Sequence, residues 1–211
     1  MSALKLPTIF TDHMVLQRDI PLTIWGSAGA GEKISVALAG QTASAVADGE
    51  GKWKTRLAAL PAGGPHELAV STGSETIRRG DVLVGDVWIC SGQSNMEWPL
   101  SASHDALAEI AAASHRQIRL LHLPRATSHQ PAGDIDAAWN VCDPKSVPEF
   151  SAVAYFFGRE IQRQVGVPIG LIGTSWGGTP AEAWTPVQDL KAHPALAHLG
   201  ENLSESDVKK P

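Results

Sequence analysis

Ser94 stands where a serine could act as a nucleophile, because it closely follows an apolar run within the segment Cys90–Trp98 (Cys-Ser-Gly-Gln-Ser-Asn-Met-Glu-Trp). The run, Val82–Val84 and Val87–Ile89, predicts a central strand that is covered on both faces of a sheet. In open α/β sheets, ligands bind beyond the carboxyl ends of the strands. Ser94 would lie there at the start of a helix, where unpaired backbone N–H groups stabilise negative charge. The simpler alternative is that Ser94 only caps that helix.

The residues around Ser94 exclude two common motifs. Residues 92–96 (Gly-Gln-Ser-Asn-Met) are not the Gly-x-Ser-x-Gly motif of α/β-hydrolases, and no Gly-Lys-[Ser/Thr] of a phosphate-binding loop follows them. A second segment, Gly173–Pro180 (Gly-Thr-Ser-Trp-Gly-Gly-Thr-Pro), follows another predicted strand over 167–172. Its Gly177 and Gly178 permit close approach of the backbone to a ligand, although a simple glycine turn would also use them.

Residues 1–80 are predicted to form an N-terminal β-sandwich domain. Short runs that alternate or carry β-branched residues are separated by Gly- and Pro-rich turns, which favours a small antiparallel sandwich. These runs are 21–25, 34–38, 43–47 and 67–71. Nothing in this half resembles a catalytic site.

Residues 81–186 change to an α/β pattern. After the strand before Ser94, the sequence predicts a helix over 106–113, a strand over 118–123, a helix over 150–165 and the strand over 167–172. Strands alternating with helices at this spacing predict parallel pairing in a layered sheet. Three strands and two helices cannot cover both faces of such a sheet, so we expect the domain to be interrupted or truncated after about residue 186. Residues 187–211 would be a linker or the start of an inserted segment.

Composition excludes several classes of protein. The 211 residues carry 17 Lys+Arg and 22 Asp+Glu, a net charge of −5 without long charge runs, which argues against nucleic-acid and anionic-membrane partners. No apolar run reaches the 18 residues that a membrane span needs, and the N-terminus has no signal-peptide core. Cys90 and Cys142 are expected to be buried free thiols, with a disulfide as the alternative. No histidine has the ligand spacing of a metal site, and His122 is not expected to be a catalytic base.

Four segments together resemble the sialate O-acetylesterase-like carbohydrate esterases, a branch of the SGNH (GDSL-type) hydrolases. The match is strongest over Gly85–Trp98, Gly-Asp-Val-Trp-Ile-Cys-Ser-Gly-Gln-Ser-Asn-Met-Glu-Trp. It extends to Asp12–Gln17, Phe150–Phe157 and Gly173–Trp184. The resemblance implies a flavodoxin-like α/β/α hydrolase domain, of which this chain holds the first half.

The resemblance also implies roles for individual residues. Ser94 would be the nucleophile, and its own N–H would form the oxyanion hole with the N–H of Gly177 or Gly178. We predict that substrate contacts come from Gln93, Asn95, Trp98 and Trp176. The tryptophans could form an aromatic wall for a sugar ring, although core packing would explain them equally well.

Two parts of the family's site are missing from this sequence. The later block that supplies a side-chain amide to the oxyanion hole is absent, and no aspartate has a histidine three positions later. The Asp-x-x-His that provides the base would come from the remainder of the same hydrolase. We therefore predict an esterase that needs no cofactor or metal and deacetylates a carbohydrate, sialic acid or a plant-type glycan, in the periplasm or after secretion. The alternative is a non-catalytic carbohydrate-binding fragment of a degenerate hydrolase.

Overall fold

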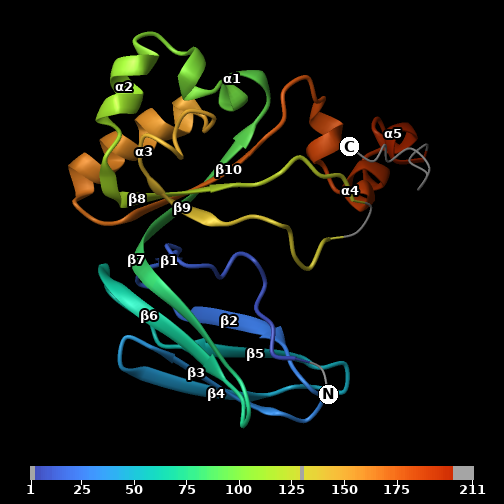
Figure 1. The fold of residues 1–211 in the computed structure, drawn as a ribbon. Helices are drawn as coiled ribbons and strands as arrows, with labels where there is room; N and C mark the ends of the chain where they lie inside the picture. The colour runs from blue at the N-terminus through green and yellow to red at the C-terminus, as the bar shows by residue number, and fades with distance from the viewer. Residues whose placement is uncertain (1–2, 129–130, 202–211) are drawn as a thin grey trace.

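The computed structural model describes residues 3–128 and 131–201 as a mixed α/β fold (Figure 1). A two-sheet β region forms one end of the molecule, and a helix-covered sheet forms the other. Within the described ranges, no helix is long and apolar enough to cross a membrane.

The β region is built from antiparallel strands that enclose one core, apart from the short β1, which pairs with β7 in parallel. Its larger sheet has the order β4-β3-β6-β7, and β2 pairs with β5 in a second sheet. The predicted runs coincide with β2, β3, β4 and β6, whereas β5 was not predicted from the sequence. The strands are β1 (Val15–Gln17), β2 (Leu22–Ser27), β3 (Lys33–Leu38), β4 (Gln41–Val46), β5 (Lys52–Leu57), β6 (Gly63–Ser71) and β7 (Thr76–Gly92). Fully buried side chains such as Ile24, Val36 and Leu68 fill the space between the sheets.

The second region continues the same sheet through β10 (Ile169–Ser175), β8 (His115–His122) and β9 (Trp139–Cys142). Strands β7, β10 and β8 are parallel, as the alternation of strands and helices predicts. Their carboxyl ends therefore meet at one edge of the sheet. The connecting helices are α1 (Ser94–Glu97), η1 (Leu100–Ala102), α2 (Ala106–Ala112), α3 (Ala152–Val165), η2 (Ala181–Trp184), α4 (Val187–Ala192) and α5 (Ala197–Glu201).

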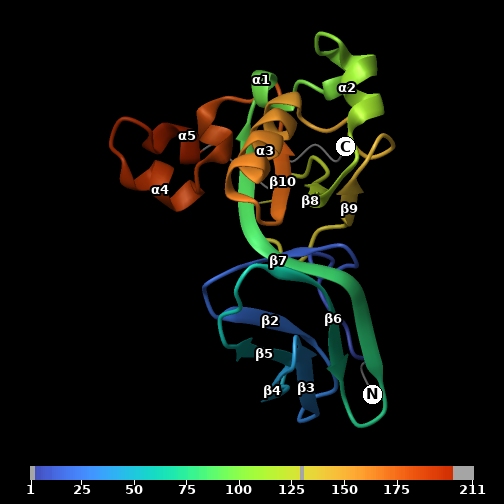
Figure 2. The same cartoon turned by 90° about the vertical axis from the view of Figure 1, so that its left-hand side faces the viewer.

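Strand β7 belongs to both regions and runs through residue 80 without interruption (Figure 2). Its first half pairs with β6 and β1, and its second half pairs with β10. Val82 and Val84 are fully buried, but 42% of Trp88 and 73% of Ile89 are exposed. The prediction that the whole run is covered on both faces is therefore wrong for Trp88 and Ile89. Trp88 packs edge-on against Phe157 of α3, so Ile89 points to the opposite face, which is left open.

Helix α3 covers the face of the sheet to which Trp88 points. The Ser151 hydroxyl caps it by accepting the N–H of Ala154, and Gly166 ends it with a φ of 68°. The buried face contains Ala154, Tyr155 and Gly158. A Cβ at Gly158 would lie 2.5 Å from a methyl carbon of Leu171 on β10, so glycine permits the close approach of helix and strand.

Candidate active site

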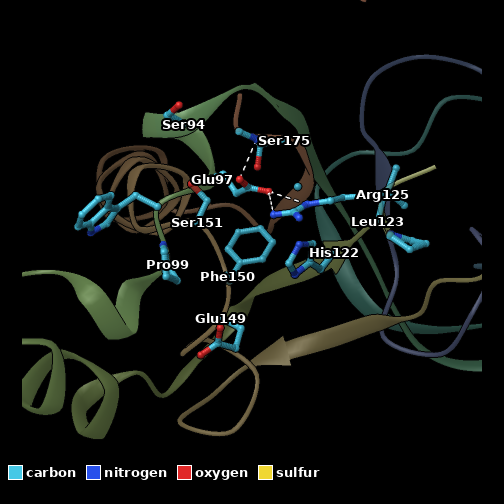
Figure 3. Close-up of a pocket in the computed structure, with 14 residues that line it drawn as sticks. Ser94, Glu97, Pro99, His122, Leu123, Arg125, Glu149, Phe150, Ser151 and Ser175 are labelled. Carbon is cyan, nitrogen blue, oxygen red and sulfur yellow. Dashed lines mark hydrogen bonds and ion pairs between the residues drawn. The ribbon is translucent and has the colours of Figure 1, made fainter. Parts of the chain in front are cut away.

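The ends of β7, β8 and β10 surround a cleft of about 560 Å³ (Figure 3). The lining residues come from the last positions of β8 and β10, from the segments that follow β7, β8 and β10, and from the start of α3 with the turn before it. These are Ser94, Glu97, Trp98, Pro99, His122, Leu123, Pro124, Arg125, Glu149, Phe150, Ser151, Gly173, Ser175 and Gly177. The cleft thus lies where parallel α/β sheets place their ligand sites, at the carboxyl edge of the strands.

Ser94 is the first residue of α1, and it is exposed to solvent at the rim of this cleft. Its hydroxyl donates a hydrogen bond of 2.7 Å to Oε1 of Gln93, and its N–H donates to the same oxygen at 3.2 Å. Gln93, not Ser94, is therefore the N-cap of α1, and the alternative in which Ser94 only caps the helix is wrong. The Ser94 hydroxyl faces an amide oxygen, which accepts a hydrogen bond but cannot act as a base at neutral pH.

The loop after β10 lies directly against α1. The Gly177 N–H donates a 2.7 Å hydrogen bond to Oε2 of Glu97. A Cβ at Gly177 would lie 2.5 Å from that oxygen and 3.6 Å from the Cα of Ser94. Gly178 is exposed, with a φ of +77°, and its N–H has no partner in the part of the chain that the structure describes. Glycine thus allows the close approach of Glu97 at 177 and favours the backbone conformation at 178.

Glu97 links the loop to the end of β8. Its Oε1 accepts hydrogen bonds from Nε of Arg125 at 2.9 Å and from Nη2 of the same guanidinium (Figure 3). Desolvation raises the pKa of the Glu97 carboxyl, but the hydrogen bonds from Arg125 and Gly177 outweigh it and hold this pKa below its ordinary value. The Arg125 guanidinium also lies 5.8 Å from the ring centroid of Trp176.

The predicted substrate-binding residues separate into two groups. Trp98 lines the cleft with 53% of its surface exposed, and its ring N–H donates to the carbonyl of Ala102 at 3.0 Å. Gln93, Asn95 and Trp176 are not among the residues that line the cleft. Gln93 caps α1 and Trp176 packs beneath Arg125, so both have structural contacts of their own.

The sequence analysis did not single out Arg125. Arg125 lies at the start of a stretch without a clear period, so only its position after the predicted strand 118–123 could have placed it in the cleft. His122 also lines the cleft, where its ring meets Phe150 edge-on at 6.0 Å.

A general base for Ser94 is missing from the described part of the chain. There, the histidine–carboxylate contacts are His13–Asp81 at 2.7 Å and His104–Asp105 at 3.3 Å, and none of these four residues lines the cleft. The His122 ring lines it, but makes no hydrogen bond to any of the described residues. The cleft therefore holds a serine and candidate oxyanion donors without a base that is poised to act.

Neither a metal nor a thiol offers alternative chemistry in the described ranges. They contain no group of three or more His, Cys, Asp or Glu side chains that could hold a metal ion. Cys90 and Cys142 are both free and buried, as the sequence predicts. Burial raises the pKa of both thiols, that of Cys142 to about 12, so neither is a reactive thiolate at neutral pH.

This parallel-stranded α/β architecture, with its cleft at the carboxyl edge, fits an α/β hydrolase-like fold. Residues 84–203 match the family described as "Carbohydrate esterase, sialic acid-specific acetylesterase". The chain belongs to this carbohydrate esterase family.

Individual relatives agree with the family assignment. The human sialate O-acetylesterase is 33% identical over 208 residues, which cover 89% of this chain and 40% of the relative. The rat sialate O-acetylesterase is 32% identical over 225 residues, covering 97% of this chain and 42% of the relative. The crystal structure of a carbohydrate acetylesterase from Xanthomonas citri superposes with a TM-score of 0.88 at 40% identity, covering 90% of this chain and 44% of that one. The chain thus spans about two fifths of the length of these relatives.

Proposed function

We propose that this chain carries the nucleophile and part of the oxyanion hole of a serine esterase that removes O-acetyl groups from carbohydrates. The observation that carries the proposal is the placement of Ser94 at the first turn of α1, in contact with the glycine loop that ends β10. A nucleophile beside backbone N–H groups that can turn to an oxyanion is the arrangement that acyl transfer requires. Membership of the acetylesterase family supports the acetyl group as the acyl group transferred.

In the proposed reaction, the Ser94 hydroxyl leaves Gln93, gives its proton to a base and attacks the acetyl carbonyl carbon. The N–H of Ser94 and one N–H of the 177–178 loop hold the oxyanion of the tetrahedral intermediate. The carbon–oxygen bond to the sugar then breaks, and the sugar oxygen takes the proton back from the base. Water hydrolyses the acetyl-enzyme by the same steps, which releases acetate and restores the serine.

The base and its orienting carboxylate are proposed to come from outside this chain, as the Asp-x-x-His of the remainder of the hydrolase. The histidine contacts in the described ranges leave the cleft without a base, and the relatives are more than twice as long as this chain. On this proposal, residues 1–80 are a β-sandwich domain and 81–186 the first half of a flavodoxin-like hydrolase domain, while 187–211 are a linker or the start of an inserted segment. The periplasm or the exterior of the cell is the proposed location.

The substrate is proposed to be an O-acetylated sugar, with sialic acid as the first to test because the relatives are sialate O-acetylesterases. The exposed ring of Trp98 supports this, since a tryptophan face in an open cleft offers apolar area to a pyranose. Gln93 and Asn95 do not line the cleft, and we propose that they contact the part of the substrate that extends beyond it. A non-catalytic carbohydrate-binding fragment is not favoured, because the relatives and the solved neighbour are acetylesterases.

The test is to isolate the protein under native conditions, treat it with a fluorophosphonate, and measure intact mass and the labelled peptide. We expect label on Ser94 in a species heavier than 22.3 kDa, the mass of this chain. Label on Ser94 in a 22.3 kDa species would contradict a base from outside the chain. No label on Ser94 would contradict the nucleophile and favour the binding fragment.

A further inference from the structure

The two glycines of the loop after β10 are in different electrostatic situations. The Gly177 N–H already donates to a carboxylate oxygen, Oε2 of Glu97, at 2.7 Å. Gly178 is an exposed residue, and its N–H has no partner in the described ranges. The two residues are neighbours, yet only one of these N–H groups is available to a ligand without breaking a charge-assisted hydrogen bond.

Glu97 is held firmly enough to keep the Gly177 N–H. Its other oxygen accepts two N–H groups of Arg125, and the Arg125 guanidinium lies over the Trp176 ring. The contacts tie together the segments that follow β7, β8 and β10. Only 27% of the Glu97 side chain is exposed, so the carboxylate is largely shielded from competing water. The titratable or charged groups that act on it are Arg125 and His122.

An oxyanion on the Gly177 N–H would meet the Glu97 carboxylate at contact distance. Two negative oxygens that share one donor repel each other, and the repulsion is strongest where water is scarce. The same carboxylate therefore disfavours Gly177 as a donor to the transition state. It also fixes the Gly177 backbone against the Cα of Ser94, which sets where the next N–H, that of Gly178, can lie.

We infer that Glu97, neutralised by Arg125, is a positioning residue that holds the Gly177 amide beside Ser94 and leaves the Gly178 N–H as the donor of this loop to the oxyanion. This inference rests on the proposed function, which left open whether Gly177 or Gly178 is the donor. Glu97 acts through the loop and does not itself touch the reacting atoms.

The first experiment follows the amide protons of Gly177 and Gly178 by NMR in the 15N-labelled 211-residue chain. A hydrogen bond to a carboxylate moves an amide proton downfield, and protonation of the acid returns it. We expect the Gly177 proton to titrate with a midpoint below 4.5, the ordinary pKa of a Glu carboxyl. In Glu97→Gln the titration should vanish. A Gly177 proton that does not titrate in the unmodified chain would overturn the inference, whatever the outcome for the esterase.

The second experiment repeats the measurement after Ser94 of the native protein has reacted with a fluorophosphonate, whose phosphoryl oxygen stands in for the oxyanion. We expect the Gly178 proton to shift downfield while Gly177 keeps its titration. If the Gly177 proton shifts instead and no longer titrates, the Glu97 carboxylate has released the Gly177 N–H to the phosphoryl oxygen, and the inference is wrong. Absence of any label is a failure of the proposed function, which the first experiment does not share.

The role of Glu97 is separated from general stability by comparing variants. Glu97→Gln keeps an oxygen that can accept the Gly177 N–H, so its rate of Ser94 labelling should stay within threefold of the native rate, whereas Glu97→Ala should lose tenfold or more. Glu160→Ala is the matched control, because Glu160 forms an exposed ion pair with Arg163 on α3, away from the cleft. Equal losses in Glu97→Gln and Glu97→Ala, or a loss in Glu160→Ala, would contradict positioning through the hydrogen bond.

Discussion

Two clusters in this molecule use the same chemistry, a carboxylate shared between an arginine and one further group, for different ends. At the junction of the two regions, the Asp81 carboxylate accepts hydrogen bonds from both terminal nitrogens of Arg119, at 2.6 and 3.2 Å. It also contacts Nδ1 of His13 at 2.7 Å. At the cleft, Glu97 accepts from Arg125 and from the N–H of Gly177. The first cluster fixes the region of β7 where the two halves meet, and the second fixes a loop.

The difference lies in the burial of the arginine. Only 4% of the Arg119 side chain is exposed, against 56% of Arg125. A buried guanidinium that loses its carboxylate keeps an uncompensated charge, whereas an exposed one is solvated by water. The junction cluster should therefore govern the stability of the fold, while the cleft cluster should govern the position of a loop at little cost in stability.

The largest effect is expected from Asp81→Asn. The asparagine retains the shape of the side chain and tolerates the positive φ of 53° at this position, so the change isolates the charge. Because Asp81 itself is 36% exposed, we expect the lower end of the range for a broken buried pair, a loss of about 3 kcal/mol in the free energy of unfolding. Urea denaturation measures it, with Glu160→Gln as an exposed-pair control that should change stability by less than about 1 kcal/mol. Equal effects of the two changes would contradict the comparison.

Gly177→Ala should have the next largest effect. Its φ is not positive, so the backbone accepts alanine, but the new Cβ would lie 2.5 Å from Oε2 of Glu97. The carboxylate must move, and we expect a loss of about 1 kcal/mol, at the low end for overpacking because a side-chain end can yield. In a Glu97→Ala background the same change should cost almost nothing. A double-mutant cycle measured by urea denaturation tests this, and additive effects would show that the two residues do not press on each other.

The sequence predicted the elements of the fold better than it predicted the contacts between charged side chains. The apolar runs and the motif around Ser94 were enough to predict the parallel strands, the helix that begins at Ser94 and the loop after β10. The pairing of Glu97 with Arg125 was not predictable, because it joins two loops that meet only when β7, β10 and β8 are assembled. Periodicity identifies apolar positions, but it does not show which partner a charged side chain will reach.

Periodicity also does not show which apolar side chains of a helix are covered. The predicted helix over 150–165 has large apolar residues at 153 and 157, yet 47% of Val153 and 38% of Phe157 are exposed. The buried face of α3 combines the large Tyr155 with small residues, and Gly158 lets the helix approach the sheet closely. Trp88 and Ile89 were misjudged for a similar reason, because an apolar run does not reveal which of its neighbours the chain supplies.

The pH dependence of stability should separate the two clusters, with a smaller effect than either Asp81→Asn or Gly177→Ala. The hydrogen bond from Arg119, opposed by desolvation and aided by His13, holds the pKa of the Asp81 carboxyl below its ordinary 3.8. A carboxyl with a lowered folded-state pKa contributes stability that is present above its unfolded value and lost as the pH falls through the folded one. The free energy of unfolding should therefore fall between pH 5 and pH 3, and less steeply in Asp81→Asn. If the free energy of unfolding falls with pH as steeply in Asp81→Asn as in the native chain, Asp81 does not cause the pH dependence.

The smallest effect on stability is expected from Arg125→Ala, and it is the most informative about the cleft. Because Arg125 is more than half exposed, its loss should change the free energy of unfolding by less than about 1 kcal/mol. The same change removes two of the hydrogen bonds that lower the pKa of Glu97, so the midpoint of the Gly177 amide titration should rise toward 4.5. Arg125→Lys should restore the charge but not the two-nitrogen contact or the stacking on Trp176, and its midpoint should lie between those of the native chain and Arg125→Ala. If the midpoint stays fixed while stability falls by about 3 kcal/mol or more, Arg125 belongs with Arg119 as a support of the fold, and the cleft has no separate positioning cluster.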